Sequence, residues 1–299
     1  MEFMEMPVDI VDIVLPFFDS QDLMNAALSC KGMLSLAAGH FPAIHDINVT
    51  LSDFPIAVKL GKCDGNDHGV TLKISDSTEC EEVVKHLLPL ICRDVKSLQI
   101  EDELINNAIS DNTFGVLFTY LKDAPLKRLN LSHCDLSKLN LHTFALLAIF
   151  NQLERFEMQG CVFRFGENNL ARILKLSSNT LTTVDIRDNG QITDNFVSKI
   201  AKVCPNLQEF RVSDCPLIAT YSALALVEST LFRRTMQLNL YLRGTSFDPH
   251  ELRKYMNSPH FNFPRDAWRL TSGVTDLLGY RKPFLLAEHF TKRGVVIHV

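Results

Sequence analysis

One apolar pattern recurs along most of this chain and restricts the folds that the chain can adopt. An apolar residue is followed three and five positions later by two more, as in Leu181, Val184 and Ile186. Copies begin at Ile44, Gly69, Val95, Leu126, Leu153, Leu181, Leu207 and Gln237, of which the first two are the weakest. Residues at helical spacing lie between copies, for example Phe114 and Leu117. One such unit cannot bury its apolar face alone, so the repeat predicts stacked strand-and-helix units with a continuous core.

Three of the eight cysteines follow the same repeat. Cys134, Cys161 and Cys215 each stand eight residues after the first apolar position of their copy, and Asn189 stands there in the intervening copy. A side chain at this position would point inward at the strand exit, where it can bond to unpaired backbone groups or fill space. We therefore favour this architectural role over a disulfide between Cys204 and Cys215. The cysteine and histidine spacings also match no familiar metal-ligand motif, so we expect no metal and no cofactor.

The segments LNLSHCDL, FEMQGCVF, VDIRDNGQIT and FRVSDCPL resemble successive leucine-rich repeats of the cysteine-containing kind. The resemblance implies an α/β solenoid whose parallel strands line a concave face and whose helices lie outside. On this basis we expect leucine-rich repeats over residues 41–245, a helical segment over 1–40 and a capping segment over 246–299. Within the capping segment, which lacks the repeat, residues 293–299 are expected to form a final strand.

The first forty residues do not follow the repeat and instead predict short apolar helices. Pro7 is well placed in the first turn of a helix, and Asp9 lies near the positive end of its dipole. Asp19 can cap a second helix, and a third short helix is expected over 31–38. Three helices of this size cannot bury their whole apolar surface among themselves, so the surplus must face the repeats or a partner.

Residues 6–38 resemble an F-box, the motif that docks substrate receptors of SCF ubiquitin ligases on a Skp-type adaptor. The resemblance is carried by Met6, Pro7, Asp9, Val14, Leu15, Phe18, Asp19, Asp22, Leu23, Cys30 and Lys31. Three residues depart from the pattern: Ser29 replaces an aliphatic residue, Met33 replaces a tryptophan, and Pro16 stands where the first helix should finish. It implies an N-terminal three-helix F-box and a non-catalytic substrate-recognition subunit, joined through the adaptor to a cullin. The implied adaptor-binding residues are Pro7, Ile10, Val14, Leu23, Leu28, Cys30 and Lys31. The alternative is an interaction scaffold without a ubiquitin-ligase role, whose N-terminal helices only cover the first strand of the repeats.

Composition and charge restrict the other classes of function. The net charge is −5, and the basic residues are not concentrated into a basic face, so we expect no nucleic-acid partner. The longest purely apolar run, residues 144–150, is too short to cross a bilayer, and the first fifteen residues contain no Lys or Arg to form a secretory signal. We therefore expect no membrane partner and an intracellular location, cytoplasmic, nuclear or both. Nucleotide-binding and nucleophile motifs do not occur in the sequence, so we expect no enzymatic activity.

Residues 64–69, DGNDHG, partly match a calcium-binding loop. His68 takes the fifth ligand position of that loop, and Ser75 takes the twelfth, where a bidentate glutamate is needed. We expect a polar turn at this place.

Alternation along each predicted strand defines the candidate site. The apolar residues would point inward, so the variable residues between and after them would point to the concave face. The predicted substrate-binding residues are Arg128, Arg155, Glu157, Asp185, Arg187, Glu209, Arg211 and Tyr241. Two interpretations stay open. The charges either pair across strands and keep the face soluble, or bind a charged protein substrate and set its specificity.

Overall fold

The computed structural model describes residues 46–51, 57–63, 66–74, 85, 88–89, 92–102, 109–233, 237–256, 268–271 and 294–298. The chain divides into two compact units, Met1–Phe150 and Asn151–Val299. The predicted F-box helices lie outside the described residues, as does every adaptor-binding residue predicted in them. Among the helices that are described, none is long and apolar enough to cross a membrane.

The first unit contains a mixed sheet. Its strands are β1 Asp46–Leu51, β2 Ala57–Cys63, β3 Asn66–Ile74, β4 Ser97–Asp102 and β5 Arg128–Asn130. Their order is β5-β4-β1-β3-β2, with every neighbouring pair parallel except β2 and β3. Leu98 of β4 lies opposite Leu129 of β5, and Ile47 of β1 lies opposite Leu98. The predicted alignment of these three copies is therefore confirmed.

The repeat copy predicted to begin at Gly69 is wrong. That copy would align Ile74 with Val49 of β1, but Leu72 lies opposite Val49, and β3 pairs on the side of β1 away from β4. The reason is local, because only two residues separate β3 from β2. Strands so close in sequence form an antiparallel hairpin, whereas parallel neighbours need a crossover of a dozen or more residues. Residues 66–69 accordingly belong to β3 and not to the predicted polar turn.

Helical segments alternate with strands from β4 onward in the first unit. The described elements are η3 Cys92–Asp94, α5 Asp111–Tyr120, β6 Asp135–Leu136, α6 Leu141–Phe144 and η4 Ala145–Ile149. The predicted helix around Leu117 is confirmed as α5, which begins after Ser110, whose hydroxyl accepts a bond from Thr113 N–H. Phe114 and Phe118 are fully buried on one side of α5, with ring centroids 4.3 Å apart. This aromatic side anchors the helix to the core of the unit.

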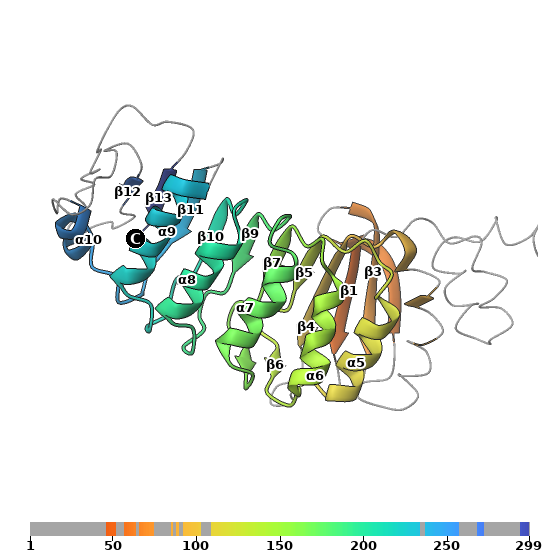
Figure 1. Ribbon diagram of the computed structural model, residues 1–299. Coiled ribbons are helices and arrows are strands. Elements are labelled where there is room, and N and C mark those ends of the chain that lie inside the picture. Colours follow the sequence, from red (N-terminus) through yellow and green to blue (C-terminus); the bar gives the residue numbers. More distant parts are fainter. Residues whose placement is uncertain are drawn as a thin grey trace, which may run out of the picture. The chain divides into compact units, whose positions relative to one another are not determined.

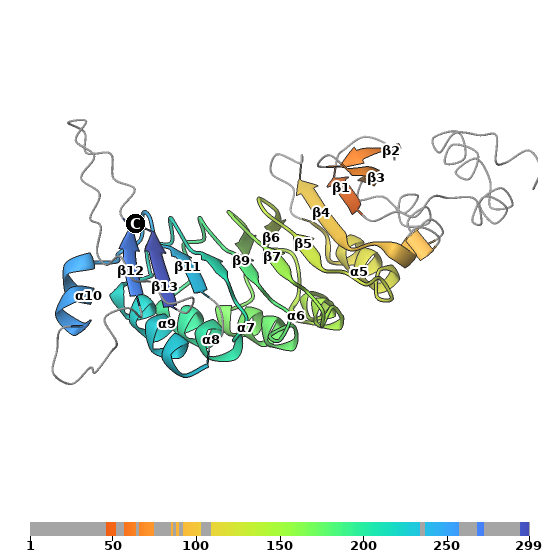
Figure 2. The ribbon, with the colours of Figure 1, turned by 90° about the horizontal axis from the view of Figure 1, so that it is seen from above.

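The second unit repeats a strand and a helix in turn (Figure 1). Its strands are β7 Arg155–Glu157, β8 Val162–Phe163, β9 Thr183–Asp185, β10 Glu209–Arg211, β11 Gln237–Tyr241, β12 Trp268–Thr271 and β13 Gly294–His298. Its helices are α7 Glu167–Leu176, α8 Asp194–Val203, α9 Thr220–Arg233 and α10 Pro249–Met256. The main strands are parallel and follow the order β12-β13-β11-β10-β9-β7. Figure 2 shows α7, α8 and α9 side by side on one side of this sheet.

The core of the second unit follows the predicted apolar positions. Phe156, Val184, Phe210 and Leu240 lie opposite one another on successive strands, and none of them is exposed to solvent. The residues before and after them in each strand are polar and face the other way. The predicted register of the last four copies is thereby confirmed, and it aligns the polar residues of neighbouring strands.

The helix layer is joined from repeat to repeat by acidic side chains. Glu167, in the first turn of α7, accepts bonds from the backbone N–H and the hydroxyl of Thr193, both at 2.9 Å. Thr193 is the residue that caps α8. Asp194, in the first turn of α8, accepts a bond from Ala219 N–H at 2.9 Å, just before α9. Carboxylates are favourable near helix N-termini, so one side chain stabilises two neighbouring helices.

The C-terminal segment continues the parallel sheet. The predicted final strand is confirmed as β13, which pairs with β11 in the register that places Leu240 opposite Ile297. β12 pairs on the other side of β13, with Leu270 opposite Ile297. Because β13 lies between β11 and β12, the last of the described strands is not at the edge of the sheet.

Candidate functional site

The polar residues of the second unit form three rows across its strands, which we call the strand face. The first row is Arg155, Thr183, Glu209 and Asn239, and the second is Glu157, Asp185, Arg211, Tyr241 and His298. The third follows the strands and consists of Gln159, Arg187, Ser213 and Arg243, held by backbone bonds between neighbouring repeats such as Gly160 N–H to Arg187 O. Seven of the eight predicted substrate-binding residues therefore lie on one face.

The eighth, Arg128, lies on β5 in the first unit. It is half-buried and stands opposite Ser97 of β4. The alternation that predicted its orientation holds there, because the neighbouring Leu129 is fully buried.

Two acids of the strand face are less exposed to solvent than its arginines. Glu157 and Asp185 are only 6% and 3% exposed. The side chains of Arg155, Arg187 and Arg211 are 38%, 35% and 29% exposed. Burying an ionised carboxylate is unfavourable unless it is paired and hydrogen-bonded, so each acid needs its arginine.

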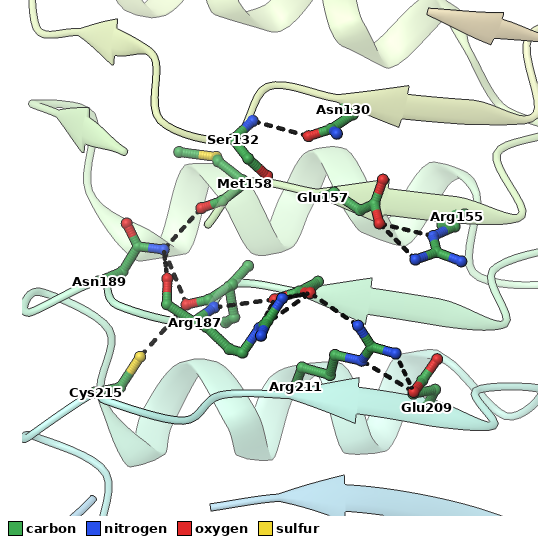
Figure 3. A network of polar contacts seen from close by, with 12 residues as sticks. Asn130, Ser132, Arg155, Glu157, Met158, Arg187, Asn189, Glu209, Arg211 and Cys215 are labelled. Atoms are coloured by element: carbon green, nitrogen blue, oxygen red, sulfur yellow. Dashed lines mark hydrogen bonds and ion pairs between the residues drawn. The ribbon is translucent and has the colours of Figure 1, made fainter. Parts of the chain in front are cut away.

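Each arginine binds an acid two residues away on the same repeat (Figure 3). The Arg155 guanidinium donates from Nε and Nη2 to one oxygen of Glu157, at 2.8 and 2.6 Å. The Arg187 guanidinium is bidentate, with Nε 2.9 Å from Oδ1 and Nη2 2.8 Å from Oδ2 of Asp185. This hydrogen bond raises the pKa of Arg187 above its ordinary value. Such planar, charge-assisted pairs fix the direction of the guanidinium as well as its charge.

One ion pair crosses between strands. Glu157 and Asp185 lie directly opposite each other on β7 and β9, and like charges at such positions repel. Arg211 Nη1 approaches Asp185 Oδ2 at 3.5 Å, while its Nη2 lies 2.7 Å from Glu209. Burial alone would lower the pKa of Arg211, but the hydrogen bonds that it donates to Glu209 and the charges of both acids raise it. The expected pairing across strands is thus observed for this pair, whereas Arg155 with Glu157, Arg187 with Asp185 and Arg211 with Glu209 pair within one repeat.

An aromatic stack ends the second row. The rings of Tyr241 and His298 are parallel within 11°, with centroids 4.4 Å apart, and the Arg211 guanidinium carbon lies 5.6 Å from the Tyr241 centroid. His298 Nε2 lies 3.5 Å from Asn239 Oδ1. Burial lowers the pKa of His298, and the nearby Glu209 opposes this effect. Sequence reasoning placed a strand over 293–299 but did not extend the second row to His298.

The strand exits are held by the repeated Asn or Cys, as expected. The Asn189 amide donates to Met158 O at 2.8 Å and Ile186 O at 2.9 Å, and its oxygen accepts from Cys161 N–H at 3.1 Å. Cys215 Sγ lies 3.4 Å from Ile186 O as a thiol donor, and burial raises its pKa to about 11. These side chains satisfy buried backbone groups of the preceding repeat and thereby position the third row.

The residue before each of these positions has a left-handed backbone conformation. Positive φ angles occur at His133, Gly160, Asp188, Asp214 and Gly244. Each stands seven residues after the first position of its copy, so the turn geometry repeats with the sequence. Glycine adopts this conformation without penalty, and Asp, Asn and His adopt it more readily than other residues.

The chemistry available at the strand face is recognition through charge and aromatic contact. Cys204 and Cys215 are separate buried thiols. Within the described part of the chain, no cluster of three or more His, Cys, Asp or Glu side chains is arranged to hold a metal ion.

Comparison with known families agrees with this geometry. The family model of the leucine-rich repeat matches residues 177–201. That stretch contains β9, its three inward apolar residues, Asn189 and most of α8. A search of curated proteins found no match to the chain. The chain therefore contains a leucine-rich repeat, set in a parallel α/β arrangement of the kind that leucine-rich-repeat proteins use.

Proposed function

We propose that this chain is a non-catalytic receptor that holds a target protein against the strand face of its second unit. The observation that carries the proposal is the alignment of half-exposed polar side chains over a fully buried apolar row. Fixed guanidiniums offer directed donors to a partner, and the edge of the Tyr241 ring, which lies between Arg211 and His298, offers apolar contact. Arginine and tyrosine are the residue types that contribute most at protein interfaces.

We further propose that the receptor belongs to an SCF-type ubiquitin ligase. Support comes from the resemblance of residues 6–38 to an F-box, which would place the Skp-type adaptor and cullin at the N-terminal segment. In this arrangement the chain brings the target to enzymes carried elsewhere in the complex. The target would occupy one part of the chain and the adaptor another, so the two contacts can be removed separately.

The ligase assignment is tested by purifying the full-length chain from cells with its bound proteins. We expect the adaptor and a cullin among them, and we expect Pro7→Ala with Leu23→Ala to lose both. Undiminished adaptor recovery with this double variant would contradict the assignment. Recovery of other partners without any adaptor from the unaltered chain would instead favour an interaction scaffold with no ubiquitin role.

The target site is tested by exchanging whole ion pairs for neutral groups. Charge reversal of Arg187 and Arg211 would leave Asp185 and Glu209 without partners, so loss of binding would be confused with unfolding. We define the pair-neutral variant by the four changes Arg155→Gln, Glu157→Gln, Glu209→Gln and Arg211→Gln. It keeps the net charge and leaves Asp185 paired with Arg187. We expect it to lose target proteins and keep the adaptor.

A matched control changes the other side of the sheet. Arg172 and Lys175 are exposed on α7, and the helix-layer variant replaces both with Gln. This variant should recover targets and adaptor normally. Equal loss of targets from both variants would contradict a site on the strand face.

A further inference from the structure

The outermost groups of the strand face are cationic although the face is nearly neutral. The side chains of Glu157 and Asp185 are 8% and 4% exposed, against 38% and 35% for their partners Arg155 and Arg187. At these two pairs a partner therefore meets guanidinium edges first and carboxylates only beneath them, whereas Glu209, at 23%, is nearly as exposed as Arg211, at 29%. Over the few ångströms of a direct contact, this layering matters more than the net charge of the patch.

The guanidiniums also keep donors on their outer edges. Arg155 and Arg187 use Nε and Nη2 for their own acids, and within the described residues Nη1 of each has no acceptor. Arg243, at the end of the third row, is exposed and forms no ion pair with any described residue. A guanidinium carries five N–H donors, so each of these arginines can bind an additional acceptor.

Acids on the strand-exit turns limit where such an acceptor can lie. Asp188 and Asp214 are exposed at the left-handed positions after β9 and β10. They repel an anion from the turns and leave the three rows of the strand face as its path. A nucleic-acid backbone, with its continuous charge, needs an unbroken basic surface, which this face does not have.

We propose that the strand face binds an extended peptide segment rich in Asp and Glu, lying across β7, β9, β10 and β11. Arg155 and Arg187 receive its carboxylates on their outer edges, and the positive charge of Arg211 lies on the next strand. The edge of the Tyr241 ring, whose faces meet Arg211 and His298, receives an apolar part of the segment. This inference rests on the proposed function, because the segment belongs to the target protein. It adds the chemical class of the target.

The width of the strand face determines the length of the probe peptide. Neighbouring strands lie about 4.8 Å apart, so β7 to β11 spans about 14 Å, which a few extended residues cross. A fluorescein-labelled peptide of about ten residues, alternating Glu and Ser, therefore covers the face. Matched peptides carry Gln or Lys in place of every Glu. Binding to the full-length chain is measured by fluorescence anisotropy at low and moderate salt.

We expect the Glu peptide to bind, to weaken as salt rises, and to bind at least about tenfold more tightly than the Gln peptide. The pair-neutral variant should lose about tenfold in affinity for it, although the net charge of the chain is unchanged. The helix-layer variant should stay within about twofold. Equal binding of the Glu and Gln peptides, or an unchanged affinity of the pair-neutral variant, overturns the proposal.

A second variant should raise the affinity for the Glu peptide instead of lowering it. Asp188→Asn with Asp214→Asn keeps a residue type that accepts the left-handed conformation and removes the repelling charges. It should increase the affinity for the Glu peptide by about threefold. An unchanged or weaker affinity would show that the segment does not lie beside these turns, and would overturn the proposed path.

The two proposals fail in different ways. If the pair-neutral variant loses cellular targets while the Glu peptide never binds the unaltered chain, the strand face is the target site and its ligand is not acidic. If the Glu peptide binds as described while target recovery is unchanged in the pair-neutral variant, the acidic site exists and the target binds elsewhere.

Discussion

Arg211 reaches Asp185 across the boundary between two repeats, with 3.5 Å between Nη1 and Oδ2. The buried Asp185 carboxylate thus has two cations, because Arg187 binds it from its own repeat. The strand face is for this reason a set of connected pairs and not a collection of independent charges. Single substitutions in it change the environment of residues on the neighbouring strand.

The first prediction concerns whether Arg187 or Asp185 contributes more to stability. Arg187→Gln removes the bidentate partner of a carboxylate that is 3% exposed, whereas Asp185→Asn leaves arginines that solvent can still reach. We expect Arg187→Gln to lower the free energy of unfolding by about 1–2 kcal/mol, allowing for the exposure of the arginine, and Asp185→Asn to lower it by less.

The measurement is urea denaturation of both single variants and of the double variant. The double variant should cost less than the sum of the single changes, with a coupling of about 0.5–1 kcal/mol or more. Additive effects would mean that the two side chains do not interact in solution.

A second prediction compares the two side chains that hold the strand exits. Asn189→Ala leaves Cys161 N–H and the carbonyls of Met158 and Ile186 without their partner. We expect it to cost about 2–4 kcal/mol of unfolding free energy, against about 1–2 kcal/mol for Cys215→Ala. Asn189→Cys, which installs the side chain of the neighbouring repeats, should recover part of the loss. Equal costs for the two alanine variants in urea denaturation would contradict the role assigned to the amide.

A third prediction concerns Gly244, which has φ of +70°. A Cβ added there would collide with the Asp214 carboxylate, with 3.1 Å left to its Cγ. Gly244→Ala should therefore lower stability by about 1–3 kcal/mol. In an Asp214→Gly background the collision is removed, and only the smaller cost of the left-handed backbone should remain. Thermal melts of the four chains test this, and an undiminished cost in the Asp214→Gly background would contradict it.

A fourth prediction follows from the lowered pKa of His298. The unfolded chain takes up a proton at this histidine near its ordinary pKa of 6.5, while the folded chain takes it up only at lower pH. Stability should thus be unaffected by this group above that pH, fall as the pH drops below it, and level off once the folded form is protonated too.

Replacing His298 with Gln should reduce the fall in unfolding free energy below pH 6.5, measured by urea denaturation at a series of pH values. An NMR titration of the folded chain should give a pKa for His298 below 6.5. A value above 6.5 would mean that Glu209 outweighs the effect of burial. Stability would then rise as the histidine is protonated.

Much of the second unit could be predicted because its physics is periodic. The apolar positions fixed the strand register, and the step of eight residues placed Asn189 and Cys215 correctly. The left-handed turns were missed, although Gly160, Gly244 and Asp188 stand one residue before those positions. Glycine and aspartate are common in many loops, so their meaning here depends on the backbone bonds between repeats, which the sequence does not display.

The hairpin of the first unit was missed for a different reason. Leu72 and Ile74 match the apolar spacing of the repeat, but the Asp64-Gly65 dipeptide before β3 favours a two-residue hairpin connection. Local turn chemistry therefore overrode the repeat pattern. The depth of the charges on the strand face was likewise hidden, because alternation tells which side a residue faces and not how far its charge lies from solvent.

Binding of a target protein to the strand face can be detected by site-specific photocrosslinking in cells. A benzophenone-bearing amino acid is placed at Thr183, which is half-buried in the first row of the strand face, or at the exposed Arg172 of α7. We expect crosslinked target from position 183 and none from position 172, with the signal at 183 lost in the pair-neutral variant. Crosslinks from position 172 alone would contradict this expectation.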